Sequence, residues 1–179
     1  MTTPIVVCFS GRIGSGKTSV SQCVATTLGA AWTSFGGFIR DAAQERGLDA
    51  NSREVLQTLG AQLISEKGTD WLCEQVITRA KWDGHQPLVI DGVRHIAVLD
   101  TIYRRLSPHR TILIHLDYDG MEDGERGMNA TSRRAAELHS TEHDVLQELP
   151  SRADLVVSTS LPLEDVVSKV LGYVKPLVY

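Results

Sequence analysis

The sequence predicts an α/β fold in which a parallel sheet of about five strands lies between layers of helices. Apolar runs alternate along the chain with segments of helical periodicity, which is typical of parallel sheets whose strands are joined by crossover helices. The strand-like runs span residues 4–10, 31–35, 87–91, 110–116 and 153–158. A glycine-rich motif follows the first run directly, at the edge of the sheet where folds of this class bind ligands.

Helical spacing of apolar residues fills the segments between these runs. After the first run, Val20, Cys23, Val24 and Leu28 recur at this spacing. Asn51, with Glu54 three residues later, predicts the start of another helix. Further stripes are Val55, Leu56, Leu59 and Leu63; Leu72, Val76 and Ile77; Ile96, Leu99, Ile102, Tyr103 and Leu106; and Val166, Val167, Val170, Leu171 and Val174. We interpret these stripes as core positions.

The glycine-rich motif predicts a nucleoside triphosphate site. Residues 11–18 read Gly-Arg-Ile-Gly-Ser-Gly-Lys-Thr and match the pattern G-x-x-x-x-G-K-[ST] completely. Glycines let the backbone turn its N–H groups toward a polyphosphate, and the helix that follows adds a partial positive charge at its N-terminus. The residues expected to contact the nucleotide are Gly11, Ile13, Gly14, Ser15, Gly16, Lys17, Thr18 and Ser19.

Three side chains around this loop have predicted chemical roles. Lys17 is expected to reach the β- and γ-phosphates, and the Thr18 hydroxyl is expected to ligate Mg²⁺. Asp91 ends the apolar run 87–91, so its carboxylate is expected beside the loop, where it would hold the same ion directly or through water. The alternative for Asp91 is a cap for the helix that starts near His95.

Two further segments carry a resemblance to known enzymes. Residues 35–40 read Phe-Gly-Gly-Phe-Ile-Arg, and residues 91–94 read Asp-Gly-Val-Arg. With the phosphate loop before them, they resemble segments of nucleoside monophosphate kinases of the adenylate/cytidylate kinase superfamily. The resemblance implies a single three-layer αβα P-loop kinase domain over residues 1–179, with a helical acceptor-binding insert at 36–82 and a short lid at 117–134.

The resemblance also implies residue roles. In that family two arginines hold the phosphate of the acceptor, and the matching positions are Arg40 and Arg94; Phe35, in the same segment as Arg40, is also expected at the acceptor. A planar guanidinium suits this role because it binds a phosphate bidentately and stays charged. For Arg40 the alternative is a solvated helix arginine. Gly37 stands where the family has an aspartate, and the family's adenine-reading glutamine has no counterpart in residues 95–99.

The segment 117–134 is expected to contribute to catalysis. It follows the fourth strand-like run, where the kinase family has its lid, and its glycines permit hinge motion. Arg126, Arg133 and Arg134 are candidate catalytic residues, since they could neutralise charge on the transferring phosphoryl group while water is excluded. The alternative is a polar loop whose acidic and basic side chains pair with one another.

Composition narrows the classes of partner and compartment. The formal net charge of −4 argues against a broad basic face for nucleic acid. The three cysteines are too few and too widely spaced for a disulfide framework, which fits a reducing cytosol. Neither a signal-peptide pattern nor an apolar run of membrane-spanning length is found. We therefore expect a soluble cytoplasmic protein, with its oligomeric state left open.

The functional prediction is an ATP-dependent small-molecule kinase with Mg²⁺ as cofactor. Its expected partners are ATP and a small phosphorylated acceptor, a nucleoside or deoxynucleoside monophosphate. Two alternatives stay open. One is a dephospho-CoA kinase-like enzyme that phosphorylates a hydroxyl, for which Asp41 or Asp91 would serve as base. The other is a nucleotide-dependent switch or regulatory ATPase.

Overall fold

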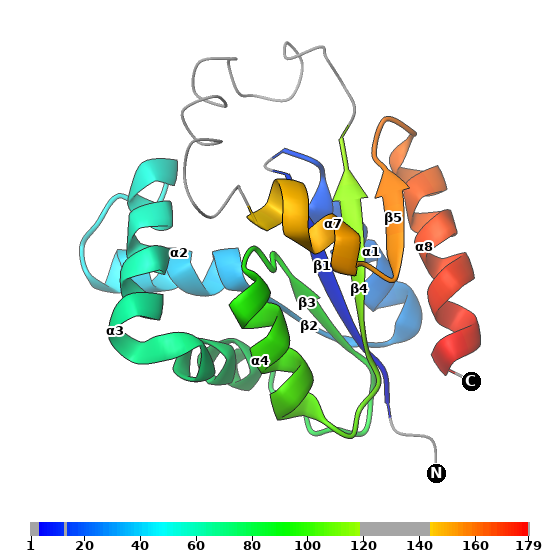
Figure 1. The fold of residues 1–179 in the computed structure, drawn as a ribbon, viewed down its shortest axis with the longest axis horizontal. Coiled ribbons are helices and arrows are strands. Elements are labelled where there is room, and N and C mark those ends of the chain that lie inside the picture. The colour runs from blue at the N-terminus through cyan, green and yellow to red at the C-terminus, as the bar shows by residue number, and fades with distance from the viewer. Residues whose placement is uncertain (1–3, 13, 119–143, 179) are drawn as a thin grey trace.

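The computed structural model describes residues 4–12, 14–118 and 144–178. Its centre is a five-stranded parallel sheet of order β2-β3-β1-β4-β5 (Figure 1). The strands are β1 Val6–Gly11, β2 Ala31–Ser34, β3 Leu88–Asp91, β4 Thr111–Asp117 and β5 Leu155–Ser158. Each lies within one or two residues of a strand-like run of the sequence, so the predicted α/β architecture is confirmed.

Helices join the strands and cover both faces of the sheet. They are α1 Lys17–Leu28, α2 Phe35–Glu45, α3 Arg53–Arg79, α4 Ile96–Leu106, the π-helical turn η1 Asp144–Glu148, α7 Leu149–Arg152 and α8 Leu163–Val178. Because side chains alternate along a strand, β1 contributes to two separate cores. Val6 and Cys8 pack with α2, α3, α4 and α7, whereas Val7 and Phe9 pack with α1 and α8. Figure 1 shows these two helical layers on opposite sides of the sheet.

Helix α3 begins and bends at positions that the apolar spacing did not predict. The Ser52 side chain, rather than that of Asn51, caps the helix by accepting a hydrogen bond from the Val55 amide at 3.4 Å. The helical segments expected around residues 51–63 and 72–77 belong to this one element, which is interrupted at Gly68. Gly68 has φ 83° and ψ 165°, a conformation that side-chain-bearing residues rarely adopt. Glycine therefore permits the sharp bend in α3 (Figure 1).

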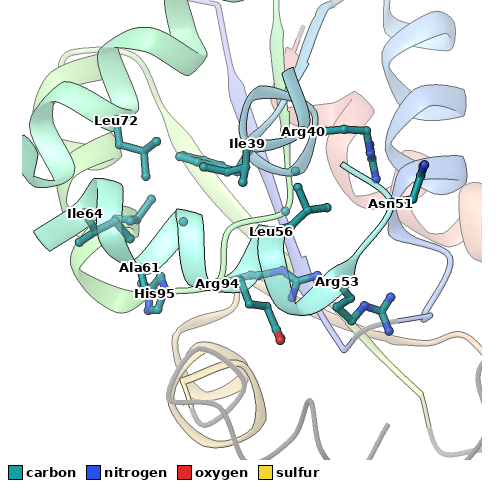
Figure 2. A pocket seen from close by; sticks show the side chains of 16 residues that line it. Ile39, Arg40, Asn51, Arg53, Leu56, Ala61, Ile64, Leu72, Arg94 and His95 are labelled. Carbon is teal, nitrogen blue, oxygen red and sulfur yellow. The ribbon is translucent and has the colours of Figure 1, made fainter. Parts of the chain in front are cut away.

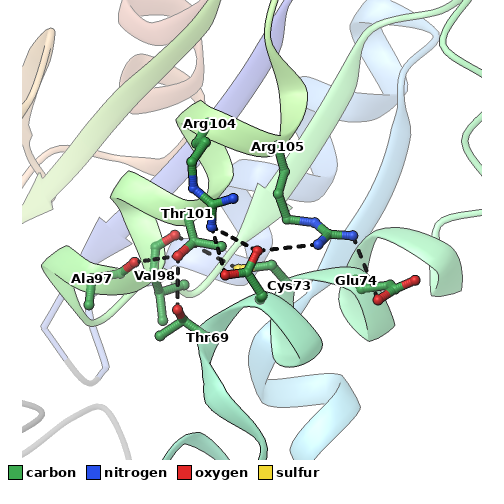
Figure 3. Close-up of polar contacts among 9 residues, drawn as sticks. Thr69, Cys73, Glu74, Ala97, Val98, Thr101, Arg104 and Arg105 are labelled. Atoms are coloured by element: carbon green, nitrogen blue, oxygen red, sulfur yellow. Dashed lines mark hydrogen bonds and ion pairs between the residues drawn. The ribbon is translucent and has the colours of Figure 1, made fainter.

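Polar contacts join the second half of α3 to α4 (Figure 3). Asp70 accepts hydrogen bonds from Arg104 at 2.7 Å and from Arg105 at 3.3 Å, and the bond from Arg104 lowers the pKa of Asp70. Beneath these exposed pairs, the Thr69 and Thr101 hydroxyls are 2.9 Å apart. Exposed ion pairs stabilise little by themselves. The hydrogen bonds to α4 and the buried apolar side chains of the core together hold this half of α3 in place beside the sheet.

In the described ranges, no helix combines the length and the apolar character that crossing a membrane requires.

A buried histidine lies beneath the glycine-rich loop. His115 of β4 is 2% exposed, and its Nδ1 lies 3.0 Å from the Ser10 hydroxyl, in the strand residue just before Gly11. Burial, reinforced by the charges of Lys17 and Arg12, lowers the pKa of His115 to about 4. The native structure therefore holds the neutral imidazole.

This burial predicts a loss of stability in acid. The unfolded chain binds a proton at the ordinary histidine pKa near 6.5, whereas the native protein binds it only near 4, so the free energy of unfolding falls across that window. We expect wild type to lose about 1–2 kcal/mol more than a His115→Asn variant between about pH 7.5 and about pH 5. Urea denaturation at both pH values measures the difference. Equal losses in the two proteins would contradict this account of His115.

Candidate functional site

The glycine-rich loop joins β1 to α1 and exposes backbone N–H groups where α1 begins. Gly14 and Gly16 have φ values of 78° and 79°, in the left-handed region that favours glycine. Gly16 immediately precedes α1, and no side chain caps that end of the helix among the described residues. At Gly11, a Cβ atom would overlap the carbonyl oxygen of Leu116. The predicted contact residue Ile13 lies outside the described residues.

Lys17 is folded over the loop and is 8% exposed. Its Nζ donates hydrogen bonds to the Arg12 carbonyl oxygen and, at 3.3 Å, to the Ser15 hydroxyl. Lys17 also lines the cavity at the loop, so its ammonium group stands at the loop's inner surface. A polyphosphate that entered this cavity would offer the ammonium group stronger, charged acceptors than these neutral oxygens.

Asp91 meets the loop as the sequence predicts. It ends β3, and the Thr18 hydroxyl donates to its Oδ2 at 2.8 Å. Asp91 is only 4% exposed, and its Oδ1 is buried without a hydrogen-bond partner in the described part of the chain. Burial raises the pKa of Asp91, against the lowering effects of the Thr18 hydrogen bond and of nearby Lys17 and Arg94.

This pair of oxygen groups fits a hard divalent cation. Mg²⁺ takes oxygen ligands and is commonly held by one or two protein groups together with phosphate oxygens. A carboxylate oxygen that is buried and unpartnered beside a hydroxyl matches that chemistry, and burial of the carboxylate favours a positive neighbour. The alternative capping role of Asp91 does not fit, since the first amide of α4, at Ile96, donates to Asp144 Oδ2 at 3.4 Å.

Two cavities open at the carboxyl edge of the sheet. The first, which we call the donor cavity, measures about 650 Å³ and lies over the loop, with Lys17, Thr18, Ser19 and Asp91 in its wall. The second, the acceptor cavity, measures about 270 Å³ and lies between α2 and α3. The apolar residues of its wall are Phe35, Ile39, Leu56, Ala61, Ile64, Leu72 and Val98.

The two cavities meet at a group of arginines. Arg40 of α2, Arg53 of α3 and Arg94 after β3 line both cavities, together with Gly36 and Gly92. Figure 2 shows these arginines toward one side of the acceptor cavity, while Ile64 and Leu72 lie toward the other. The arrangement offers an anion site at the junction and an apolar compartment beyond it.

The structure thus brings together residues that are far apart in the sequence. Arg40, Arg94 and Phe35 all line the acceptor cavity, and Arg40 is an exposed residue of α2 at its mouth. Leu56, assigned to the core from its spacing, packs against the edge of the core and also lines this cavity, whereas Leu59 and Leu63 are fully buried in the core. This difference arises because α3 packs on the sheet with one face and borders the cavity with another.

Several site residues were not found from the sequence. Arg53, Gln57, Asn51 and His95 line the acceptor cavity, and Arg79 lines the donor cavity, where it pairs with Asp41 at 2.7 Å. A pattern in the sequence could have identified the residues that α3 contributes. The α3 residues at the acceptor cavity have i, i+3, i+4, i+7, i+8 and i+11 spacing, which marks one face of a helix. They are Arg53, Leu56, Gln57, Gly60, Ala61 and Ile64.

The predicted lid arginines Arg126, Arg133 and Arg134 lie outside the described residues, as does most of the segment 117–134.

Comparison with known proteins supports the fold. No model of a known protein family matches the chain, and no curated protein sequence matches it. A solved structure of a protein from Chloroflexus aurantiacus is 23% identical, with 98% of each chain covered and a TM-score of 0.62.

Two further solved structures come from enzymes that act on different small molecules. A shikimate kinase from Aquifex aeolicus is 14% identical, with coverage of 95% of this chain and 96% of that one and a TM-score of 0.54. A gluconokinase from Sinorhizobium meliloti is 15% identical, with coverage of 99% and 95% and a TM-score of 0.51. With the parallel sheet and the loop at its carboxyl edge, these likenesses show that the chain has the P-loop kinase-like fold that its sequence predicts.

Proposed function

We propose that this protein is an ATP-dependent kinase that transfers the γ-phosphate to a small acceptor, a nucleoside or deoxynucleoside monophosphate. The observation that carries the proposal is the junction of the donor and acceptor cavities at Arg40, Arg53 and Arg94. Two phosphate groups of different molecules can meet there. A nucleotide-dependent switch needs one nucleotide site and a surface that binds a partner. Its mechanism does not require a second cavity lined by arginines.

On the donor side, the loop residues would hold the ATP phosphates. Backbone N–H groups of the loop and the N-terminus of α1 favour an anion, and Lys17 would move from its neutral acceptors to the β- and γ-phosphates. Thr18 and Asp91 are the groups that would hold Mg²⁺. When bound, that ion supplies positive charge to the phosphate oxygens.

On the acceptor side, the site favours a phosphate over a hydroxyl. Guanidinium groups match a phosphate bidentately, and the arginines stand where the acceptor cavity opens toward the loop. A hydroxyl acceptor would call for a general base. Asp41 is engaged by Arg79 at 2.7 Å, and Asp91 accepts a hydrogen bond from Thr18. A phosphate oxygen is already ionised and needs no base.

Catalysis would then consist mainly of positioning and charge neutralisation. Phosphoryl transfer requires little covalent chemistry from a protein. Lys17 and the three junction arginines would hold the reacting oxygens near one another, and the insert 36–82 would form the acceptor site. A contribution of Arg126, Arg133 or Arg134 to the transferring group is part of the proposal and rests on the sequence alone.

The direct test measures ADP release at saturating ATP and Mg²⁺ against a panel of acceptors. The panel contains the ribo- and deoxyribonucleoside monophosphates and dephospho-CoA. We expect ADP release to depend on at least one nucleoside monophosphate. Activity with dephospho-CoA alone would favour the hydroxyl acceptor, and equal ADP release without any acceptor would favour the switch.

Loss of the loop lysine should weaken ATP binding and abolish turnover. A charge-assisted hydrogen bond is worth about 1.5–3 kcal/mol, so we expect Lys17→Ala to weaken ATP binding about 10- to 150-fold. Calorimetry with ATP and Mg²⁺ measures the affinity, and thermal denaturation checks that the variant is folded. Lys175→Ala, on the exposed surface of α8, is the matched control. Wild-type affinity and rate in Lys17→Ala would overturn the proposed ATP site.

Loss of a junction arginine should affect the acceptor more than ATP. We expect Arg40→Ala or Arg94→Ala to lower kcat/KM for the acceptor about 10- to 150-fold, because either change removes a charged contact to its phosphate. Steady-state kinetics with each substrate varied in turn separates the two sites. Arg46→Ala, just after α2 and outside both cavities, should behave as wild type. An effect confined to the KM for ATP would contradict the two-site model.

A further inference from the structure

The acceptor cavity has one face built from a single helix. The six α3 residues that line it follow helical spacing, and they begin with Arg53 at the junction and end with Ile64 at the apolar side. On this face three residues have apolar side chains and one has no side chain: Leu56, Ala61 and Ile64, and Gly60. Gln57 is therefore a polar side chain set among apolar neighbours, one helical turn from Arg53.

The amide group of Gln57 is not satisfied by the protein around it. Its Nε2 is buried and has no hydrogen-bond partner in the parts of the chain that the structure describes. A primary amide carries two N–H donors, and nearly all buried donors in proteins are paired because an unpaired one destabilises the fold. The neighbouring Gln62, on the exposed side of the same helix, has its Nε2 bonded to Glu66 at 2.7 Å. The difference marks Gln57 as a donor that lacks an acceptor atom.

We propose that Gln57 is a specificity-determining residue of the acceptor site, whose Nε2 donates to a carbonyl oxygen on a compact ring of the acceptor. The inference rests on the proposed function, since it takes the acceptor phosphate to lie at Arg40, Arg53 and Arg94. Gln57 is four residues after Arg53, which is about 6 Å along the helix axis. In a nucleoside monophosphate, one pentose separates the phosphate from the ring by a length comparable to the distance between Arg53 and Gln57 along the helix.

The size of the cavity adds a second constraint on the ring. At about 270 Å³, the cavity is at the small end of small-molecule sites, which span roughly 300–1,000 Å³. The side chains of Phe35, Ile39 and Leu72 provide apolar contact area for a ring, and Gln57 provides the directional contact. A single ring with a carbonyl group satisfies both conditions better than a bulky double ring.

The test compares Gln57→Met with wild type and with the matched control Gln62→Met. Methionine preserves the length of the side chain and removes the donor. Isothermal titration calorimetry measures binding of CMP, UMP, AMP and ribose 5-phosphate in the presence of a non-hydrolysable ATP analogue. Thermal denaturation gives the Tm of each ligand-free protein, and ADP release gives kcat and KM for the same acceptors.

We expect two opposite effects in Gln57→Met. The Kd for CMP or UMP should rise about 10-fold, because the carbonyl group of the ligand loses its donor, and acceptor KM should rise with it. The Tm of the ligand-free protein should rise by about 2–4 °C, because an unpaired buried donor is removed. Affinity for ribose 5-phosphate, which has no ring carbonyl, should stay unchanged, as should kcat and ATP affinity. Gln62→Met should match wild type in acceptor binding.

Three results would overturn the role of Gln57. One is equal affinity of wild type and Gln57→Met for every nucleotide, and another is the absence of nucleotide binding to wild type. The third is a lower Tm together with equal losses for ribose 5-phosphate and for the ATP analogue, which would indicate a structural role. Binding that shows the expected pattern without any ADP release would leave Gln57 supported and would count against the proposed kinase activity instead.

Discussion

The central strand β1 is paired on both sides, to β3 and to β4, and this pairing fixes the geometry of the whole site. In register with β3, Phe9 lies opposite Asp91, and in register with β4, Gly11 lies opposite Leu116. The strand is completely buried, so it cannot shift without disrupting both cores. The loop that follows Gly11 is therefore held beside the Asp91 carboxylate, and the start of α1 faces the same edge.

The site concentrates positive charge in a protein that is acidic as a whole. The formal net charge of the chain is −4. The wall of the donor cavity nevertheless contains more cationic than acidic side chains: Lys17, Arg40, Arg53, Arg79 and Arg94 against Asp41 and Asp91. A cleft of this kind focuses a positive potential on its contents, which favours polyphosphates locally.

Sequence patterns predicted the parts of the site that depend on local structure. The phosphate loop is a continuous motif. Asp91 is the last residue of a buried strand and Arg94 lies three residues beyond it, so the topology of a parallel sheet places both near the loop. The orientation of α3 could not be predicted in the same way. Its apolar stripe mixes Leu59, which is buried in the core, with Leu56, which lines the acceptor cavity. Only the packing of α3 against both α2 and the sheet separates these two faces, and thereby brings Arg53 and Gln57 to the acceptor cavity.

The central claim is that two phosphate-bearing molecules meet at the arginine junction. Inhibition by a bisubstrate analogue, in which two nucleosides are joined by a polyphosphate, tests it most directly. If the two cavities form one continuous site, the analogue competes with both ATP and the acceptor, and it binds more tightly than either nucleoside phosphate alone. Competition with ATP alone, at the affinity of an ordinary nucleotide, would contradict the claim and leave only a single nucleotide site.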